Sequence, residues 1–181
     1  AKRRAGGHRR HRRGAGGAAA AVAMTGHWLG EPAQWPQHLS LVLQHALDHL
    51  PREACGYVVG PSLPPLFVPL RNSAVAPERS FAVADVVALR ELDRRCAAGE
   101  PVVFYHSHPQ GAASFSDQDR ARWTTDHGPT WRLDHLVLGC TARAVTEMAL
   151  LRWAADQREY VVHARLPSLL ASKGLAPGAH L

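Results

Sequence analysis

Apolar residues recur with helical spacing in two parts of the chain. In residues 37–50 they follow one another at intervals of three and four, and Pro51 ends the segment. The same spacing runs through residues 81–98, with Asp85 near its start and Gly99 after its end. A shorter segment, residues 117–127, predicts a third helix that packs Trp123 inward. These patterns are typical of amphipathic helices that each bury one face.

Short apolar runs bounded by turn residues predict the strands of a sheet. They cover residues 57–59, 66–70, 101–105, 133–139, 145–153 and 160–166. Pro69 cannot donate a hydrogen bond to a neighbouring strand, so the 66–70 strand is expected at an edge. The order of strands and helices predicts an α/β protein, with a mostly antiparallel or mixed sheet flanked by helices.

The candidate chemistry gathers at the end of the 101–105 strand. His106 and His108 are two positions apart, and side chains at such positions of a strand point to the same face. Ser116 is a suitable N-cap for the helix that begins at Asp117, which puts Asp119 in the first turn. Asp119 could therefore fold back toward the two imidazoles.

Two imidazoles and one carboxylate form a ligand set suited to catalytic zinc. Such sites keep a fourth position open for water, and bound zinc lowers the pKa of that water to about 7. A simpler interpretation also holds for part of the set. Ser116 and Asp119 have the spacing of a capping box, and an acidic residue is favoured in the first turn of a helix.

The run His-Ser-His-Pro, six further residues and then Ser-x-x-Asp resembles the motif of the JAMM (MPN+) zinc metalloproteases. The family also has an upstream glutamate before a Cys-Gly and a short strand, and Glu53 followed by Ala54, Cys55 and Gly56 fits that pattern. The resemblance implies that His106, His108 and Asp119 bind one Zn²⁺ ion. It also implies that Glu53 is the general base and that Ser116 stabilises the oxyanion.

The same resemblance implies a fold and a class of substrate. The fold would be the cytidine-deaminase-like α/β/α sandwich of MPN domains, with a central mixed sheet flanked by helices. Family members hydrolyse peptide or isopeptide bonds at the C-terminus of ubiquitin or ubiquitin-like proteins. Small bacterial members resemble enzymes that act on sulfur-carrier proteins, so a ubiquitin-like or sulfur-carrier protein is the expected partner.

Two other functions remain open at this point. One is a non-catalytic MPN-type scaffold that binds proteins, although the intact ligand set and Glu53 argue against it. The other is a nucleic-acid-associated protein like those of the RadC type, whose motif is similar and whose loop matches Gln110 and Gly111. The distribution of charge argues against a nucleic-acid partner. The net charge of the chain is +6, but the first thirteen residues alone carry seven basic residues and no acidic one. The rest of the chain is close to neutral.

Composition sets the expected domain organisation of the 181 residues. Residues 1–23 are expected to be a disordered basic tail, 24–166 the metalloprotease domain and 167–181 a flexible tail. The tail at 1–23 could bind anionic partners, act as a weak signal peptide or have no function. Three widely spaced cysteines and the lack of a long apolar run predict a cytoplasmic protein without a membrane span.

Other candidate residues are given structural interpretations. His38, His45 and His49 lie on the 37–50 helix, where no third ligand is evident, and are expected on its solvated side. Cys55 is expected to be a small buried packing residue, because no cationic partner is apparent that would favour its thiolate.

Overall fold

A six-stranded mixed sheet organises residues 27–166, which are the residues described by the structure, a computed structural model. The predicted tails at 1–23 and 167–181 lie outside the described residues. The strand order is β2-β1-β3-β6-β7-β8. The strands are β1 (Cys55–Val59), β2 (Leu66–Leu70), β3 (Val102–Pro109), β6 (Asp134–Cys140), β7 (Val145–Ala154) and β8 (Glu159–Leu166). Strand β2 is an edge strand, as Pro69 predicts.

The centre of the sheet is the parallel pair of β3 and β6, whereas all other neighbours are antiparallel. A parallel pair needs a crossover connection. Here the chain crosses over through helix α4 (Asp117–Trp123) and a small hairpin of β4 (Thr124–Thr125) and β5 (Gly128–Pro129). The first turn of α4 therefore lies beside the end of β3, where the two histidines are.

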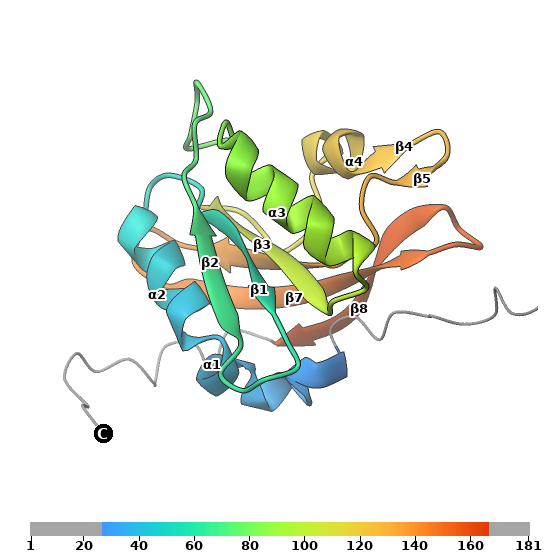
Figure 1. Ribbon diagram of the computed structural model, residues 1–181. Helices are drawn as coiled ribbons and strands as arrows, with labels where there is room; N and C mark the ends of the chain where they lie inside the picture. The colour runs from blue at the N-terminus through green and yellow to red at the C-terminus, as the bar shows by residue number, and fades with distance from the viewer. Residues whose placement is uncertain (1–26, 167–181) are drawn as a thin grey trace, which may run out of the picture.

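Helices cover both faces of the sheet (Figure 1). One face packs against α1 (Trp35–His38) and α2 (Ser40–His49), which follow the short helices η1 (His27–Leu29) and η2 (Pro32–Gln34). The other face packs against α3 (Val86–Ala97) and α4, with Leu92 and Trp123 buried in that layer. The protein is therefore an α/β/α sandwich with a central mixed sheet, as expected.

Strand alternation separates the two cores. Val58, Val103 and Tyr105 point toward α2, whereas Tyr57, Phe104 and Val137 point toward α3. His106 follows Tyr105 and so belongs to the face covered by α3 and α4. Glu53, two residues before Cys55, has the same parity as Cys55 and Tyr57, which lie on that face.

The structure corrects the predicted ends of three helices. Helix α3 begins at Val86 and not at residue 81, because the Asp85 carboxylate caps it by accepting from the backbone N–H groups of Val87 and Ala88. Helix α4 ends at Trp123, since residues 124–129 form the β4–β5 hairpin. The predicted 37–50 helix is two helices, because the backbone breaks at Leu39. Within residues 27–166, none of the helices combines the length and the apolar character that crossing a membrane requires.

Candidate metal centre

The two histidines lie at the end of the central strand β3. Their Nε2 atoms are 3.1 Å apart, so both imidazoles are directed at one point. His106 is completely buried, with the Phe81 ring at 5.0 Å and the Phe115 ring at 6.0 Å between centroids. The side chain of His108 is 15% exposed and faces the outside of the site. One histidine is thus fixed by packing, and the other can be reached from solvent.

Asp119 reaches the same point from the first turn of α4. Its Oδ1 lies 3.4 Å from Nε2 of His106, and its Oδ2 lies 3.3 Å from Nε2 of His108. The turn is closed by a capping box, in which the Ser116 hydroxyl accepts from the Asp119 N–H and the Asp119 carboxylate accepts from the Ser116 N–H. The capping interpretation is therefore right, and it is compatible with a ligand role because the cap aims the carboxylate at the histidines.

The three side chains have the geometry of a metal site. Their potential ligand atoms all lie within 4.8 Å of one another, and no other such trio is found in residues 27–166. Nδ1 of His108 lies 3.0 Å from the carbonyl oxygen of Ala112. A carbonyl only accepts hydrogen bonds, so Nδ1 carries a proton, and in the neutral ring the lone pair of Nε2 is left for a metal. The donor set and this tautomer both fit a metal such as zinc.

Charge balance in the site keeps Asp119 ionised. Burial alone would raise the pKa of Asp119, but hydrogen bonds from His106, His108 and Ser116 outweigh burial and hold it far below its usual value. Burial lowers the pKa of His106, which favours the neutral ring that a metal requires. For His108, burial has the same effect, but the hydrogen bond and the negative charge of Asp119 outweigh it and raise the pKa.

Glu53 lies beside this trio, from the segment that leads into β1. It is 6% exposed, and burial raises its pKa to about 7. His108 and Arg122 act against this rise, whereas the charge of Asp119 adds to it. The backbone is held on both sides, since the Glu53 N–H donates to the Pro77 carbonyl at 2.6 Å and Asn72 Nδ2 donates to the Glu53 carbonyl at 2.9 Å.

The site therefore combines two histidines, two carboxylates and a capping serine, in the chain order of the motif. The family model for prokaryotic homologs of the JAB domain matches residues 36–159, well over half of the chain. The protein belongs to this family. The match covers Glu53, Ser116 and the His106–His108–Asp119 trio, so the whole site lies inside the JAB domain.

This JAB-domain protein was also compared with solved structures and with curated proteins. The solution structure of protein DSY2949 from Desulfitobacterium hafniense is similar to it, with a TM-score of 0.48 and 21% sequence identity. That similarity covers 70% of this chain and 85% of the other. No curated protein matches the chain.

Ser116 lies on the exposed side of the JAB-domain site. Its hydroxyl donates to Asp119 Oδ2 at 2.6 Å while accepting from the Asp119 N–H at 3.2 Å. Both of its hydrogen-bonding functions are thus used by Asp119 in this structure. Its predicted action on an oxyanion, like the predicted roles of Glu53 and the three ligands, stays a prediction.

Several supporting residues were not identified from the sequence. Ser107, between the two histidines, is completely buried, and its Oγ accepts from the Ala54 N–H at 2.9 Å. Glu147 of β7 accepts from the Ala113 N–H at 3.2 Å and so holds the loop between His108 and Ser116. Phe81 covers His106 and carries the Arg122 guanidinium 4.3 Å above its ring. The local patterns gave no signal for these contacts, because each partner is distant in the sequence.

The prediction for Cys55 is confirmed, and that for His45 is wrong. Cys55 is completely buried, and burial raises the pKa of its thiol to about 12, with the charge of Glu53 adding to the rise. His45 is half-buried between α2 and the sheet, where its Nδ1 lies 2.9 Å from the hydroxyl of Tyr105. The periodicity of α2 could not show this, because Tyr105 comes from β3. His49 is exposed, as expected.

Proposed function

We propose that the protein is a zinc-dependent metallopeptidase or isopeptidase. The observation that carries this proposal is the convergence of His106, His108 and Asp119 within 4.8 Å, with Glu53 buried beside them. A trio of ligands that leaves room for water is typical of catalytic rather than structural zinc sites. A bound zinc ion supplies Lewis-acid chemistry, which polarises a carbonyl and makes water a nucleophile near neutral pH.

Glu53 is assigned as the general base. A general base works best when its pKa lies near the working pH, and that of Glu53 is raised to about 7. Its carboxylate takes a proton from the attacking water and passes the proton to the leaving amine. The hydrogen bonds to Pro77 and Asn72 fix the backbone of Glu53 and so limit where the carboxylate can lie.

Ser116 is assigned to the carbonyl oxygen of the substrate. Ser116 is an exposed residue at the rim of the site, and the proton of its hydroxyl can be donated to the negative charge that develops on that oxygen. In the present arrangement the proton is given to Asp119 Oδ2, so the hydroxyl has to rotate before it can act. The Asp119 N–H remains available to hold the serine oxygen during that rotation.

The proposed substrate is the C-terminal segment of a ubiquitin-like protein, with a sulfur-carrier protein as the first choice. This rests on the resemblance to JAMM enzymes and on the membership of the JAB-domain family. The proposed location is the cytoplasm, because the three widely spaced cysteines do not suggest a disulfide framework. Nucleic acid is not the proposed partner, since the excess positive charge lies in the first thirteen positions and the rest of the chain is close to neutral.

The first test is the metal content of the full chain, measured by mass spectrometry after zinc is supplied. We expect one zinc ion per chain in the wild type, none in His108→Ala and one in His127→Ala, a matched change at an exposed histidine. The second test is hydrolysis of a ubiquitin-like protein with a C-terminal extension. No zinc in the wild type would end the metal-site proposal. Zinc without hydrolysis of any such tail would favour the scaffold function instead.

A further inference from the structure

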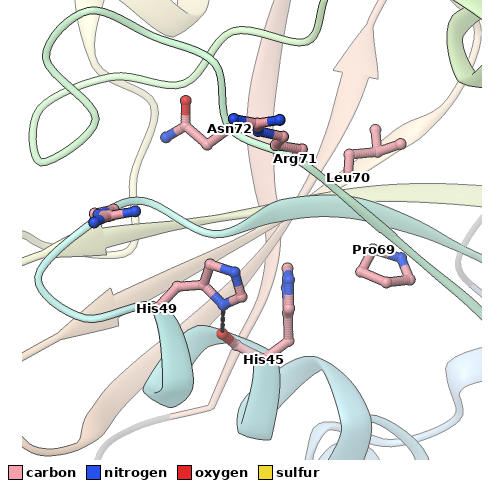
Figure 2. Close-up of a pocket in the computed structure, with 7 residues that line it drawn as sticks. His45, His49, Pro69, Leu70, Arg71 and Asn72 are labelled. Atoms are coloured by element: carbon pink, nitrogen blue, oxygen red, sulfur yellow. Dashed lines mark hydrogen bonds between the residues drawn. The ribbon is translucent and has the colours of Figure 1, made fainter. Parts of the chain in front are cut away.

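A second site lies on the opposite face of the sheet from the metal centre. It is a pocket of about 350 Å³ between α2 and the end of β2, and its polar lining is His45, His49, Arg52, Arg71 and Asn72. Figure 2 shows the two imidazoles rising from α2 toward the segment that carries Arg71 and Asn72. No carboxylate lines the pocket, and Pro69 gives it an apolar wall.

The hydrogen bond from Tyr105 decides what His45 presents to this pocket. Burial lowers the pKa of His45 to about 4, and the neighbouring His49 lowers it further, so the ring is neutral. The buried Tyr105 hydroxyl has no other partner within the described part of the chain, and its proton is satisfied only when it donates to Nδ1 of His45. The proton of the imidazole is then on Nε2, which makes His45 a hydrogen-bond donor on its free side.

His49 has the opposite tautomer. Its Nδ1 lies 2.9 Å from the carbonyl oxygen of His45, which can only accept, so Nδ1 carries a proton (Figure 2). The Nε2 of a neutral His49 is therefore an acceptor. The imidazole rings are 4.1 Å apart between centroids, so a donor and an acceptor stand side by side. A phosphate group that keeps one P–OH can satisfy both, whereas an ionised carboxylate can only accept.

The two arginines supply the positive charge. Among residues 27–166, neither Arg52 nor Arg71 forms an ion pair, and both are exposed. The acidic residue whose charge acts on His45 is Asp48, which is not in the lining and accepts a hydrogen bond from Gln44 at 2.7 Å. Guanidinium groups bind phosphate through paired hydrogen bonds, so this arrangement favours an oxyanion and disfavours a metal cation.

We propose that this pocket binds a small phosphate-bearing molecule. The phosphate lies between Arg52 and Arg71 and contacts the Nε2 atoms of His45 and His49. The remainder of the ligand packs on Pro69. A volume of about 350 Å³ is at the small end of the range for ligand sites, which excludes large ligands.

The pocket is built from the two segments that hold Glu53. Arg52 directly precedes Glu53, and Arg71 directly precedes Asn72, whose Nδ2 donates to the carbonyls of Glu53 and Ser80 at 2.9 and 3.0 Å. A phosphate that bridges the two arginines therefore also restrains the backbone of Glu53. This gives the site a means of acting on the metal centre across the sheet.

The test is a titration of the metal-free full chain with inorganic phosphate, phenyl phosphate and benzoate. Binding is measured by calorimetry and by amide NMR. It requires neither metal nor turnover, so its failure is distinct from failure of the proposed function. We expect saturable phosphate binding, at least equal affinity for phenyl phosphate, and affinity for benzoate weaker by about tenfold or more. Equal binding of benzoate, or no saturable binding at low ionic strength, would overturn the proposal.

Matched variants locate the binding. The double variant Arg52→Gln/Arg71→Gln should weaken phosphate binding by about tenfold or more, because it removes both charged hydrogen-bond partners of the phosphate. The control Arg90→Gln/Arg143→Gln removes the same charge at exposed positions and should leave affinity within about twofold. Equal weakening in both would mean a general charge effect and would overturn the site. Phosphate should also slow hydrogen exchange of the Glu53 N–H, and unchanged exchange would overturn the coupling to Glu53.

Discussion

Ser107 and Ala54 form a pair of reciprocal hydrogen bonds between β3 and the segment that carries Glu53. The Ser107 N–H donates to the Ala54 carbonyl, and the Ala54 N–H donates to Ser107 Oγ, both at 2.9 Å. Ser107 stands between the two histidines, and Ala54 follows Glu53 directly. This pair therefore sets the distance between the proposed base and the proposed ligands.

Replacing Ser107 by alanine should lower the stability of the protein. The buried Ala54 N–H would lose its side-chain partner, which we expect to lower the free energy of unfolding by about 1–3 kcal/mol. Urea denaturation measures that loss. The control Ser80→Ala removes a hydroxyl that bonds the Ala76 carbonyl in an exposed turn and should change stability by less than about 0.5 kcal/mol. Equal stability of Ser107→Ala and wild type would contradict the role of this hydroxyl.

Gly139 allows the loop between His108 and Ser116 to lie against β6. A Cβ at Gly139 would come within 2.8 Å of the Ala113 backbone nitrogen and 2.9 Å of the Gly111 carbonyl oxygen. Because both contacts are to backbone, Gly139→Ala must move the loop that leads to Ser116 and accepts from His108. We expect about tenfold or greater loss of zinc affinity, in the range caused by changes around metal ligands.

A second glycine gives the control for that experiment. Gly99 has a φ of +72°, so alanine there strains the backbone, but no atom lies within 4 Å of its added Cβ. Gly99→Ala should lower stability by about 1 kcal/mol and leave zinc affinity unchanged. Competition with a chelator measures the affinity of both variants. If Gly139→Ala binds zinc as tightly as Gly99→Ala, the loop is not what orients His108.

Glu53→Gln should retain zinc and lose turnover. The amide keeps the size of the side chain but cannot take a proton, so we expect hydrolysis to fall by about 100-fold or more. By contrast, His108→Ala or Asp119→Ala should lose both zinc and activity. Glu78→Gln, the same change at an exposed glutamate, serves as the control. Full activity in Glu53→Gln would rule out its role as the base.

Glu53→Gln should also change how the stability of the metal-free protein depends on pH. The pKa of Glu53 is raised from 4.5 to about 7 by burial, so the folded protein holds this proton more tightly than the unfolded chain does. The contribution of Glu53 to stability is thus greatest below pH 4.5 and falls as the pH rises to about 7, above which that contribution is lost. Glutamine cannot ionise and avoids that loss.

The difference between the two proteins is the measurement. Unfolding free energies from pH 4 to 8 should show Glu53→Gln gaining on the wild type by up to about 3 kcal/mol, since one pKa unit is worth about 1.4 kcal/mol. The gain should shrink when zinc is added, because a nearby cation favours the ionised carboxylate. A constant difference across this range would mean that Glu53 is not held in a protonated form.

The elements that depend on local pattern were predicted well, and the trio of candidate ligands followed from them. His106 and His108 share a face because strand geometry requires it, and Asp119 lies in the first turn because Ser116 caps the helix. Phe81 was assigned to a helix by its spacing, but it lies in the loop before α3 and packs on His106. From the sequence alone, a side chain such as Phe81 that continues the periodicity of the next helix cannot be distinguished from one that covers a site.

The contacts that could not be predicted join residues distant in the chain. His45 and Tyr105 are 60 positions apart, and Ala54 and Ser107 are 53 apart. Neither pair leaves a periodic signal, since each depends on which strands become neighbours in the sheet. The pairing of β1 with β3 brings Ala54 to Ser107, and the packing of α2 on the sheet brings His45 to Tyr105, so these residues acquire their roles only at the level of topology.

His135 gives a last prediction, on stability behind the metal site. It is completely buried on β6, and neither ring nitrogen has a partner in the described part of the chain. The Trp123 and Tyr160 rings contact it at 4.5 and 4.7 Å between centroids, and burial lowers its pKa well below the usual value. A buried polar group without a partner reduces stability by about 1–3 kcal/mol.

Leucine has nearly the volume of histidine and no polar atoms, so His135→Leu should unfold at equal or higher urea concentration than the wild type. A loss of more than about 1 kcal/mol would contradict this prediction and would show that the ring nitrogens of His135 contribute a favourable interaction.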